Sequence, residues 1–201
     1  KIGAGTLNIS TSIANSASAV PNIYDGSVIL SGAAGTMTTG QTQNWKFWGP
    51  SRLFLDNSST FLANRLGGAN GLIFAGGTFQ YAANPTAYST ETTTGGLTFA
   101  WGNGTFQVDT SAASSAITFG SLTGPQGGTN LVFRTGGTNA AFGTALNRVL
   151  FTTAPALSNG ILAAANNGVT VVVDANGVNF ATYNTTGYAT GANVGGIQAF
   201  Q

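Results

Sequence analysis

Hydrophobic residues along the chain occur in short runs in which apolar and small or polar side chains alternate, and Gly, Asn and Ser separate the runs. This period-two pattern is typical of β-strands, and helical periodicity is nearly absent. The predicted strands are Ser27–Ser31, Arg52–Asp56, Gly71–Ala75, Thr78–Tyr81, Leu97–Trp101, Thr105–Asp109, Ala116–Gly120, Asn130–Arg134 and Arg148–Thr152. The sequence therefore predicts an all-β protein.

Several strands share one phrase, an apolar residue followed by any residue and then Phe. It occurs at Leu72–Phe74, Leu97–Phe99, Ile117–Phe119 and Leu131–Phe133, with starts separated by 25, 20 and 14 residues. A second phrase, Gly77–Tyr81, is echoed 27 residues later by Gly104–Val108. Coils with two kinds of strand and loops of variable length account for both phrases. We expect Phe74, Phe99, Phe119 and Phe133 to share one column of the core.

The pattern favours a parallel β-helix, or β-solenoid, of short stacked strands with a C-terminal hairpin. The alternative is an antiparallel β-sandwich, which uses the same alternation. The chain holds 13 Phe against three Trp and five Tyr, and Phe suits a narrow core because its ring has no polar group to satisfy. The expected organisation is a single elongated β-solenoid unit over residues 1–201, either alone or as one repeat of a larger protein.

Two local features near the C-terminus shape this prediction. Val169–Val173 and Val178–Tyr183 flank Asp174-Ala175-Asn176-Gly177, and Asn-Gly supplies the positive φ values of a tight turn, so we expect a hairpin here. The stretch Pro155–Ala165 before it predicts a short helix or an irregular turn, and the residues do not choose between the two.

Charge is scarce in this chain. Charged residues make up 5% of the 201 residues and the formal net charge is +1, which gives no basic field to attract nucleic acid or anionic lipid. No run reaches the roughly 18 apolar residues that a membrane span needs, so we expect no membrane insertion. Weak charge repulsion instead favours self-association into a homopolymer. Low charge with abundant Gly, Thr, Asn and Ala is typical of bacterial surface and matrix proteins, which predicts an extracellular or cell-surface location.

The residues that most enzymes need are missing. Histidine and cysteine are absent, which removes the usual general base, the common nucleophile arrangements and most transition-metal sites. The acids are Asp25, Asp56, Glu91, Asp109 and Asp174, and none lies within ten residues of another. Asp174, Asn176 and Gly177 resemble the start of a calcium loop but lack its further oxygen ligands. We therefore predict no enzyme activity, no catalytic residue, no cofactor and no metal site.

Two groups of residues are candidates for contacts with other molecules. Trp45, Trp48 and Arg52 lie in the segment richest in aromatic and basic side chains, which predicts core capping, a subunit interface or a glycan contact. Neither end of the sequence shows a polar cap, although an open solenoid end exposes unpaired strand edges. A subunit junction is therefore expected at Ile2, Leu7, Ile9, Ile197 and Phe200.

Both ends of the chain resemble known repeats. Gly3–Ser10 followed by Gly26–Gly32 resembles the phrase of autotransporter-associated β-strand repeats. The C-terminal part is similar to the closing phrase of units in large repetitive surface proteins of planctomycete-like and verrucomicrobia-like bacteria, through Arg148–Leu157, Asn159–Leu162, Asn179–Tyr183 and Gly195–Phe200. The resemblance implies a parallel β-helix in a secreted passenger, with no catalytic residues to carry over.

The expected function is that of an extracellular structural protein. It would self-assemble into a surface fibre, sheath or matrix scaffold by end-to-end β-strand association. The alternative is an autotransporter-like adhesin or carbohydrate-binding passenger domain that contacts surface glycans through Trp45, Trp48 and Arg52. A polysaccharide-lyase-like β-helix enzyme would need paired acids that the sequence lacks.

Overall fold

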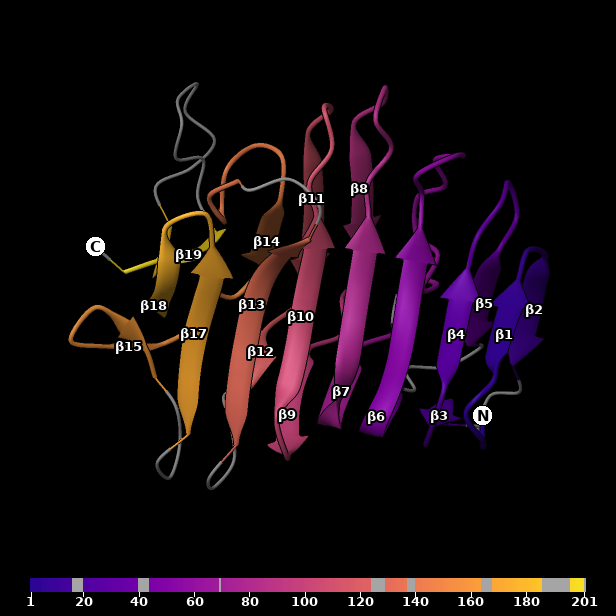
Figure 1. Ribbon diagram of the computed structural model, residues 1–201, viewed down its shortest axis with the longest axis horizontal. Coiled ribbons are helices and arrows are strands. Elements are labelled where there is room, and N and C mark those ends of the chain that lie inside the picture. Colours follow the sequence, from indigo (N-terminus) through magenta and orange to yellow (C-terminus); the bar gives the residue numbers. More distant parts are fainter. Residues whose placement is uncertain are drawn as a thin grey trace.

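The computed structural model describes residues 1–15, 20–39, 44–68, 70–123, 129–136, 140–163, 168–185 and 196–200. These residues form a β-solenoid in which most strands pair in parallel with the strand one coil earlier, and they contain no helix (Figure 1). The prediction of an all-β parallel solenoid with a C-terminal hairpin is confirmed. The sandwich alternative is wrong, since its sheets would be antiparallel.

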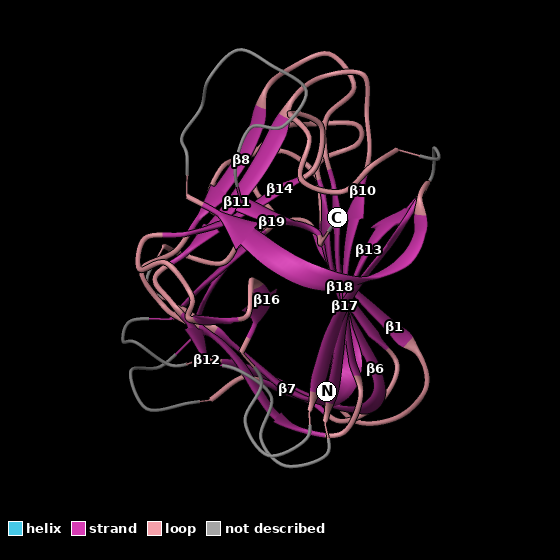
Figure 2. Cartoon of the chain, turned by 90° about the vertical axis from the view of Figure 1, so that its left-hand side faces the viewer, coloured by secondary structure: helices cyan, strands magenta, loops and turns pink. Residues whose placement is uncertain are grey.

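A coil of the solenoid passes through three faces, seen along the stack in Figure 2. The first face contains β3 (Asn22–Ile23), the first halves of β6 (Trp45–Asp56) and β7 (Leu72–Ala82), β9 (Leu97–Trp101) and β12 (Leu122–Thr123). The second contains β1 (Thr6–Ile9), β4 (Ser27–Leu30), the second halves of β6 and β7, β10 (Gly104–Asp109), β13 (Asn130–Gly136) and β17 (Val169–Asp174). The third face consists of two sheets, β2 (Ser12–Asn15) with β5 (Thr36–Thr39), and β8 (Ser89–Thr92) with β11 (Ser115–Phe119) and β14 (Arg148–Phe151).

The strand register explains the repeat seen in the sequence. On the second face Ser27 pairs with Arg52, Arg52 with Thr78, and Thr78 with Thr105, so these coils take 25 to 27 residues each. The two echoing phrases are adjacent strands of this face, because Phe79 pairs with Phe106. The 27-residue separation is therefore the length of one coil.

Glycine makes the bend between the first and second faces. Gly49, Gly76 and Gly102 occupy it on successive coils with φ values of 51°, 102° and 68°. A Cβ atom on Gly76 would lie 3.0 Å from the backbone nitrogen of Gly49. Positive φ and close stacking together favour glycine at this corner.

The core is filled by phenylalanine columns, one behind each face. Phe47, Phe74 and Phe99 stack behind the first face, Phe79, Phe106 and Phe133 behind the second, and Phe119 with Phe151 behind the third. The prediction of one shared column is wrong, although all four of its members are buried. The phrase marks an inward-pointing Phe on a strand, and such strands occur on every face.

The C-terminal end of the solenoid is closed by two antiparallel strands. β18 (Gly177–Asn184) pairs with β17 and then crosses the end of the stack, where β19 (Gly196–Ala199) pairs with it (Figure 2). Ala181 and Ile197 are fully buried under this cap. In the predicted hairpin turn the positive φ lies at Gly177 (99°), and Asn176 does not share it.

A second, smaller hairpin lies between β14 and β17. β15 (Leu157–Ser158) pairs antiparallel with β16 (Ile161–Leu162) through a turn in which Asn159 and Gly160 have φ values of 51° and 80°. The prediction of a helix or an irregular turn is therefore wrong for residues 155–163, and residues 164 and 165 lie outside the described residues. The pair Asn159-Gly160 is typical of a tight hairpin turn, because both residues adopt positive φ readily.

Candidate functional site

Three aromatic side chains form a row on the outside of the first face. The Tyr24 and Trp48 ring centroids lie 5.8 Å apart with planes inclined by 15°, and those of Trp48 and Trp101 lie 6.2 Å apart at 11°. Tyr24 is 49% exposed and Trp101 is 63% exposed. We call Tyr24, Trp48 and Trp101 the aromatic row.

Strand alternation and one small residue build this row. Trp45 and Phe47 point into the core, so Trp48 points outward at the end of the first half of β6. Trp48 pairs with Ala75, and Ala75 pairs with Trp101 on the next coil. The small side chain of Ala75 leaves room for the two indole rings to approach each other.

A second column of outward side chains runs beside the aromatic row. Asn22, Lys46, Ile73, Thr98 and Thr123 are in register along β3, β6, β7, β9 and β12. We call these five residues the polar column, since four of them carry hydrogen-bonding groups. Trp48 Nε1 donates to Asn22 Oδ1 at 3.2 Å, which links the row to the column.

The other two members of the predicted contact site lie elsewhere. Trp45 is 1% exposed and belongs to the core, which agrees with capping or packing and rules it out as a surface contact on this face. Arg52 lies past the bend on the second face, with its guanidinium carbon 4.5 Å from the centre of the Phe54 ring. The sequence-based prediction of the contact site did not include Tyr24 and Trp101. Their separations from Trp48 in the sequence are close to one and two coil lengths, and this spacing is the signal that could have found them.

The N-terminal end of the solenoid is open. β1 pairs only with β4, and β2 only with β5, so each presents an unpaired edge within the described part of the chain. A hollow of about 290 Å³ opens here, lined by Leu7, Ile13, Val28, Met37 and Trp45 among others. Trp45 Nε1 is buried without a hydrogen-bond partner at this end.

The C-terminal end is closed but carries exposed apolar side chains. Val178 is 70% exposed, Phe180 52%, Leu157 43% and Phe200 40%. Among the predicted junction residues, Ile2, Leu7 and Phe200 are exposed. Ile9 and Ile197 are buried within the core of this chain, which corrects the expectation that they are free to contact a neighbour.

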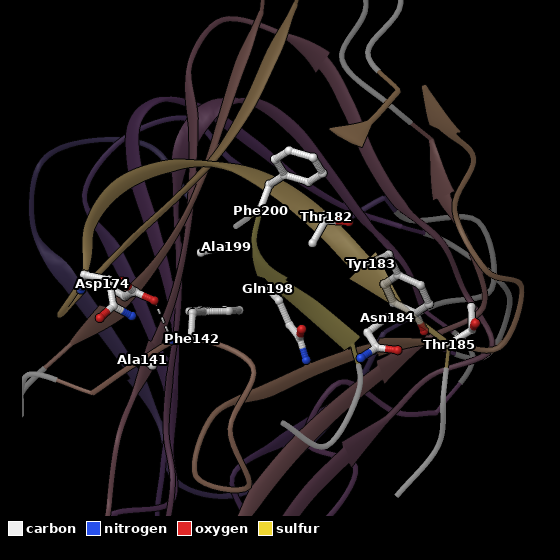
Figure 3. A pocket seen from close by; sticks show the side chains of 11 residues that line it. Ala141, Phe142, Asp174, Thr182, Tyr183, Asn184, Thr185, Gln198, Ala199 and Phe200 are labelled. Carbon is white, nitrogen blue, oxygen red and sulfur yellow. Dashed lines mark hydrogen bonds between the residues drawn. The ribbon is translucent and has the colours of Figure 1, made fainter. Parts of the chain in front are cut away.

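A polar hollow of about 380 Å³ lies beside the cap (Figure 3). Asp174 accepts a hydrogen bond from the backbone nitrogen of Phe142 at 2.7 Å on one side, and Gln198, Asn184 and Tyr183 line the other. Asp174 is the one ionisable acid in the lining. Across the described residues, no three His, Cys, Asp or Glu side chains lie close enough to hold a metal ion.

Glu91 is an acid that lies inside the molecule. Its carboxylate is fully buried and accepts hydrogen bonds from the backbone nitrogens of Arg65 and Leu66 at 2.9 and 3.0 Å. Burial raises the pKa of Glu91 to about 7, against the opposing effect of these two donors. Because solvent does not reach it, the group serves the fold.

No protein-family model, curated protein or solved structure matches this chain. The described part of the chain contains no helix that is long and apolar enough to cross a lipid bilayer.

Proposed function

We propose that this protein is an extracellular structural module that associates end to end into a surface fibre, sheath or matrix scaffold. The two ends of the solenoid are the contact surfaces in this proposal. The open N-terminal end of one copy receives the apolar cap of the next.

The distribution of exposed apolar side chains carries the proposal. Among the described residues, the large exposed aliphatic and Phe side chains all belong to the first coil or to the C-terminal hairpins and cap: Ile2, Leu7, Ile13, Leu157, Val169, Val178, Phe180 and Phe200. The large exposed apolar residues between them, Tyr24, Tyr88 and Trp101, all carry a polar group. Apolar surface gathered in this way is typical of an interaction site.

The unpaired edges of β1 and β2 support the same surface. Such edges form hydrogen bonds readily with another strand, and natural proteins usually cover or charge them. A contact between unlike ends is heterologous, so it repeats without closing and produces filaments. With a formal net charge of +1, long-range repulsion does not oppose the growth of such a filament.

Sedimentation velocity at micromolar concentration tests this proposal. The unmodified chain is expected to form a concentration-dependent series of oligomers. The double variant Leu7→Lys/Ile13→Lys should remain monomeric, because two charges would enter the apolar hollow of the open end.

A matched control places the same charges on the side of the solenoid. Thr92→Lys/Thr94→Lys changes two exposed residues, the last residue of β8 on the third face and one residue just beyond it, so its oligomers should equal those of the unmodified chain. A monomeric unmodified chain, or equal assembly of all three proteins, would contradict end-to-end association.

The alternative function is that of an adhesin or carbohydrate-binding passenger. The aromatic row favours it, since aromatic rings at the surface beside hydrogen-bonding groups suit a sugar ligand. The two functions use different surfaces, so one chain can have both.

A further inference from the structure

We infer that the outside of the first face binds a linear, extended and uncharged polysaccharide, with its sugar rings against the aromatic row and its hydroxyl groups toward the polar column. This inference is independent of association at the ends. It concerns the side of the solenoid, where a bound chain would run along the long axis.

The arrangement of the rings matches a straight ligand. The Tyr24–Trp48 and Trp48–Trp101 separations of 5.8 and 6.2 Å are nearly equal, and the planes differ by 15° and 11°. Tyr24 and Trp48 lie on adjacent coils and Trp101 lies two coils beyond Trp48, at register positions of the same face, so the row runs along the stack. The three rings stack on one another, so their outer edges form a continuous strip, and an extended chain that runs along this strip can contact several members of the row at once.

The polar column supplies hydrogen bonds beside the rings. Asn22 and Lys46 precede Tyr24 and Trp48 by two residues, so their side chains leave the strand on the same side as the rings. Amide, ammonium and hydroxyl groups from Asn22, Lys46 and Thr98 can all bond to sugar hydroxyls. Lys46 is the one charged member of the column, which gives little attraction for a polyanion.

The central ring of the row is held in place before any ligand arrives. Trp48 Nε1 donates to Asn22 Oδ1 at 3.2 Å, and the Trp48 backbone nitrogen donates to Ser51 Oγ at 3.1 Å. Ordering a side chain on binding costs free energy, so an ordered ring favours affinity.

The size of the surface separates a glycan from other partners. The row is one ring wide and is flanked by polar side chains, whereas a stable protein interface buries roughly 800 Å² on each partner. A narrow strip of apolar rings with hydroxyl-binding neighbours therefore favours a single polysaccharide chain over a protein.

Native affinity electrophoresis in gels containing a soluble polysaccharide tests the inference. The probes are hydroxyethylcellulose, xyloglucan and glycol chitin, whose β-1,4-linked backbones are extended, and dextran, whose backbone is flexible. At least one extended probe should retard the protein, while dextran should not. Trp48→Ala and Trp101→Ala should each weaken the retardation roughly tenfold, since each removes one ring from the strip that the polysaccharide contacts.

Tyr88→Ala is the matched control, because it removes a 52% exposed aromatic ring outside the row. It should leave retardation unchanged, and circular dichroism should show that all variants stay folded. No retardation by any of the three extended probes would overturn the inference. Equal retardation of the tryptophan variants and the unmodified chain would overturn it as well. The sedimentation experiment is read separately, so failure here leaves end-to-end association standing.

Discussion

At the scale of single residues, Arg65 and Glu91 fill a gap in the third face. The described residues of the coil between β5 and β8 form no strand on this face, and the Arg65 carbonyl instead accepts a hydrogen bond from the backbone nitrogen of Met37 on β5. On the other side, the carboxylate of Glu91 on β8 accepts hydrogen bonds from the backbone nitrogens of Arg65 and Leu66. The Arg65 guanidinium donates to the carbonyls of Gly32, Gly35 and Thr60. These two side chains replace the missing strand hydrogen bonds.

The buried carboxyl of Glu91 makes stability depend on pH. Its pKa is about 7 in the folded protein against 4.5 for an ordinary glutamate, so the folded state holds this proton more tightly than the unfolded state. The contribution of Glu91 to the free energy of unfolding is complete below pH 4.5 and is lost as the pH rises toward 7, by about 1.4 kcal/mol per unit and by roughly 3 to 4 kcal/mol in total.

Urea denaturation between pH 4.5 and pH 7 measures this effect. Glu91→Gln should flatten the dependence, and should be the less stable protein at the acidic end because its amide nitrogen faces a backbone donor. Asp109→Asn, outside the core, should keep the slope of the unmodified chain. A stability that rises from the acidic to the neutral end in the unmodified chain would contradict this account.

The phenylalanine columns predict where truncation costs most. Phe106 is fully buried, and its ring centroid lies 4.6 Å from that of Phe79, 5.6 Å from Phe133 and 5.8 Å from Phe119. Phe106→Ala should lower the free energy of unfolding by about 3–5 kcal/mol through the cavity it leaves. Phe180→Ala, at a 52% exposed position, should change it by no more than about 0.5 kcal/mol. Similar losses in the two variants would place Phe106 outside the core.

At the scale of elements, the positions of the strands could be predicted from the sequence better than the faces on which they lie and the strands with which they pair. Alternation located nearly every strand of the second face, because an inward apolar residue at every second position is a local property of the sequence. The face on which a strand lies depends on loop lengths, which is why Phe119 and Phe133 were assigned to the wrong column. Tyr24 and Trp101 were missed for the same reason, since only the register brings them beside Trp48.

The C-terminal cap depends on one hydroxyl group. Tyr183 Oη on β18 accepts from the backbone nitrogen of Phe151 at 3.0 Å and donates to its carbonyl at 3.2 Å, which joins the cap to the end of β14. Tyr183→Phe should therefore cost about 1–3 kcal/mol by leaving both backbone groups unpaired. Chemical denaturation with Tyr24→Phe as the control, at an exposed position, checks this. Equal stabilities for the two variants would show that this hydroxyl does not hold the cap.

At the scale of the whole molecule, the two ends differ. The sequence indicated open ends at both termini, but β18 and β19 close the C-terminal end. The hairpin that takes β18 off the coil path was predicted, whereas the closure depends on the pairing of β18 with β19, which is not a local property of the sequence. An open end with an apolar hollow and a closed end with an apolar outer surface favour a contact between unlike ends. In the proposed assembly, this difference between the ends sets the direction in which copies add.

Cross-linking between engineered cysteines tests end-to-end association most directly, since the chain has no cysteine of its own. The variant with Leu7→Cys at the open end and Val178→Cys at the cap is treated with a short bis-maleimide. End-to-end association should give a ladder of covalent dimers, trimers and longer species on a denaturing gel, and no ladder from either single-cysteine variant. A double variant that stays monomeric, or single variants that link into dimers as readily, would contradict it.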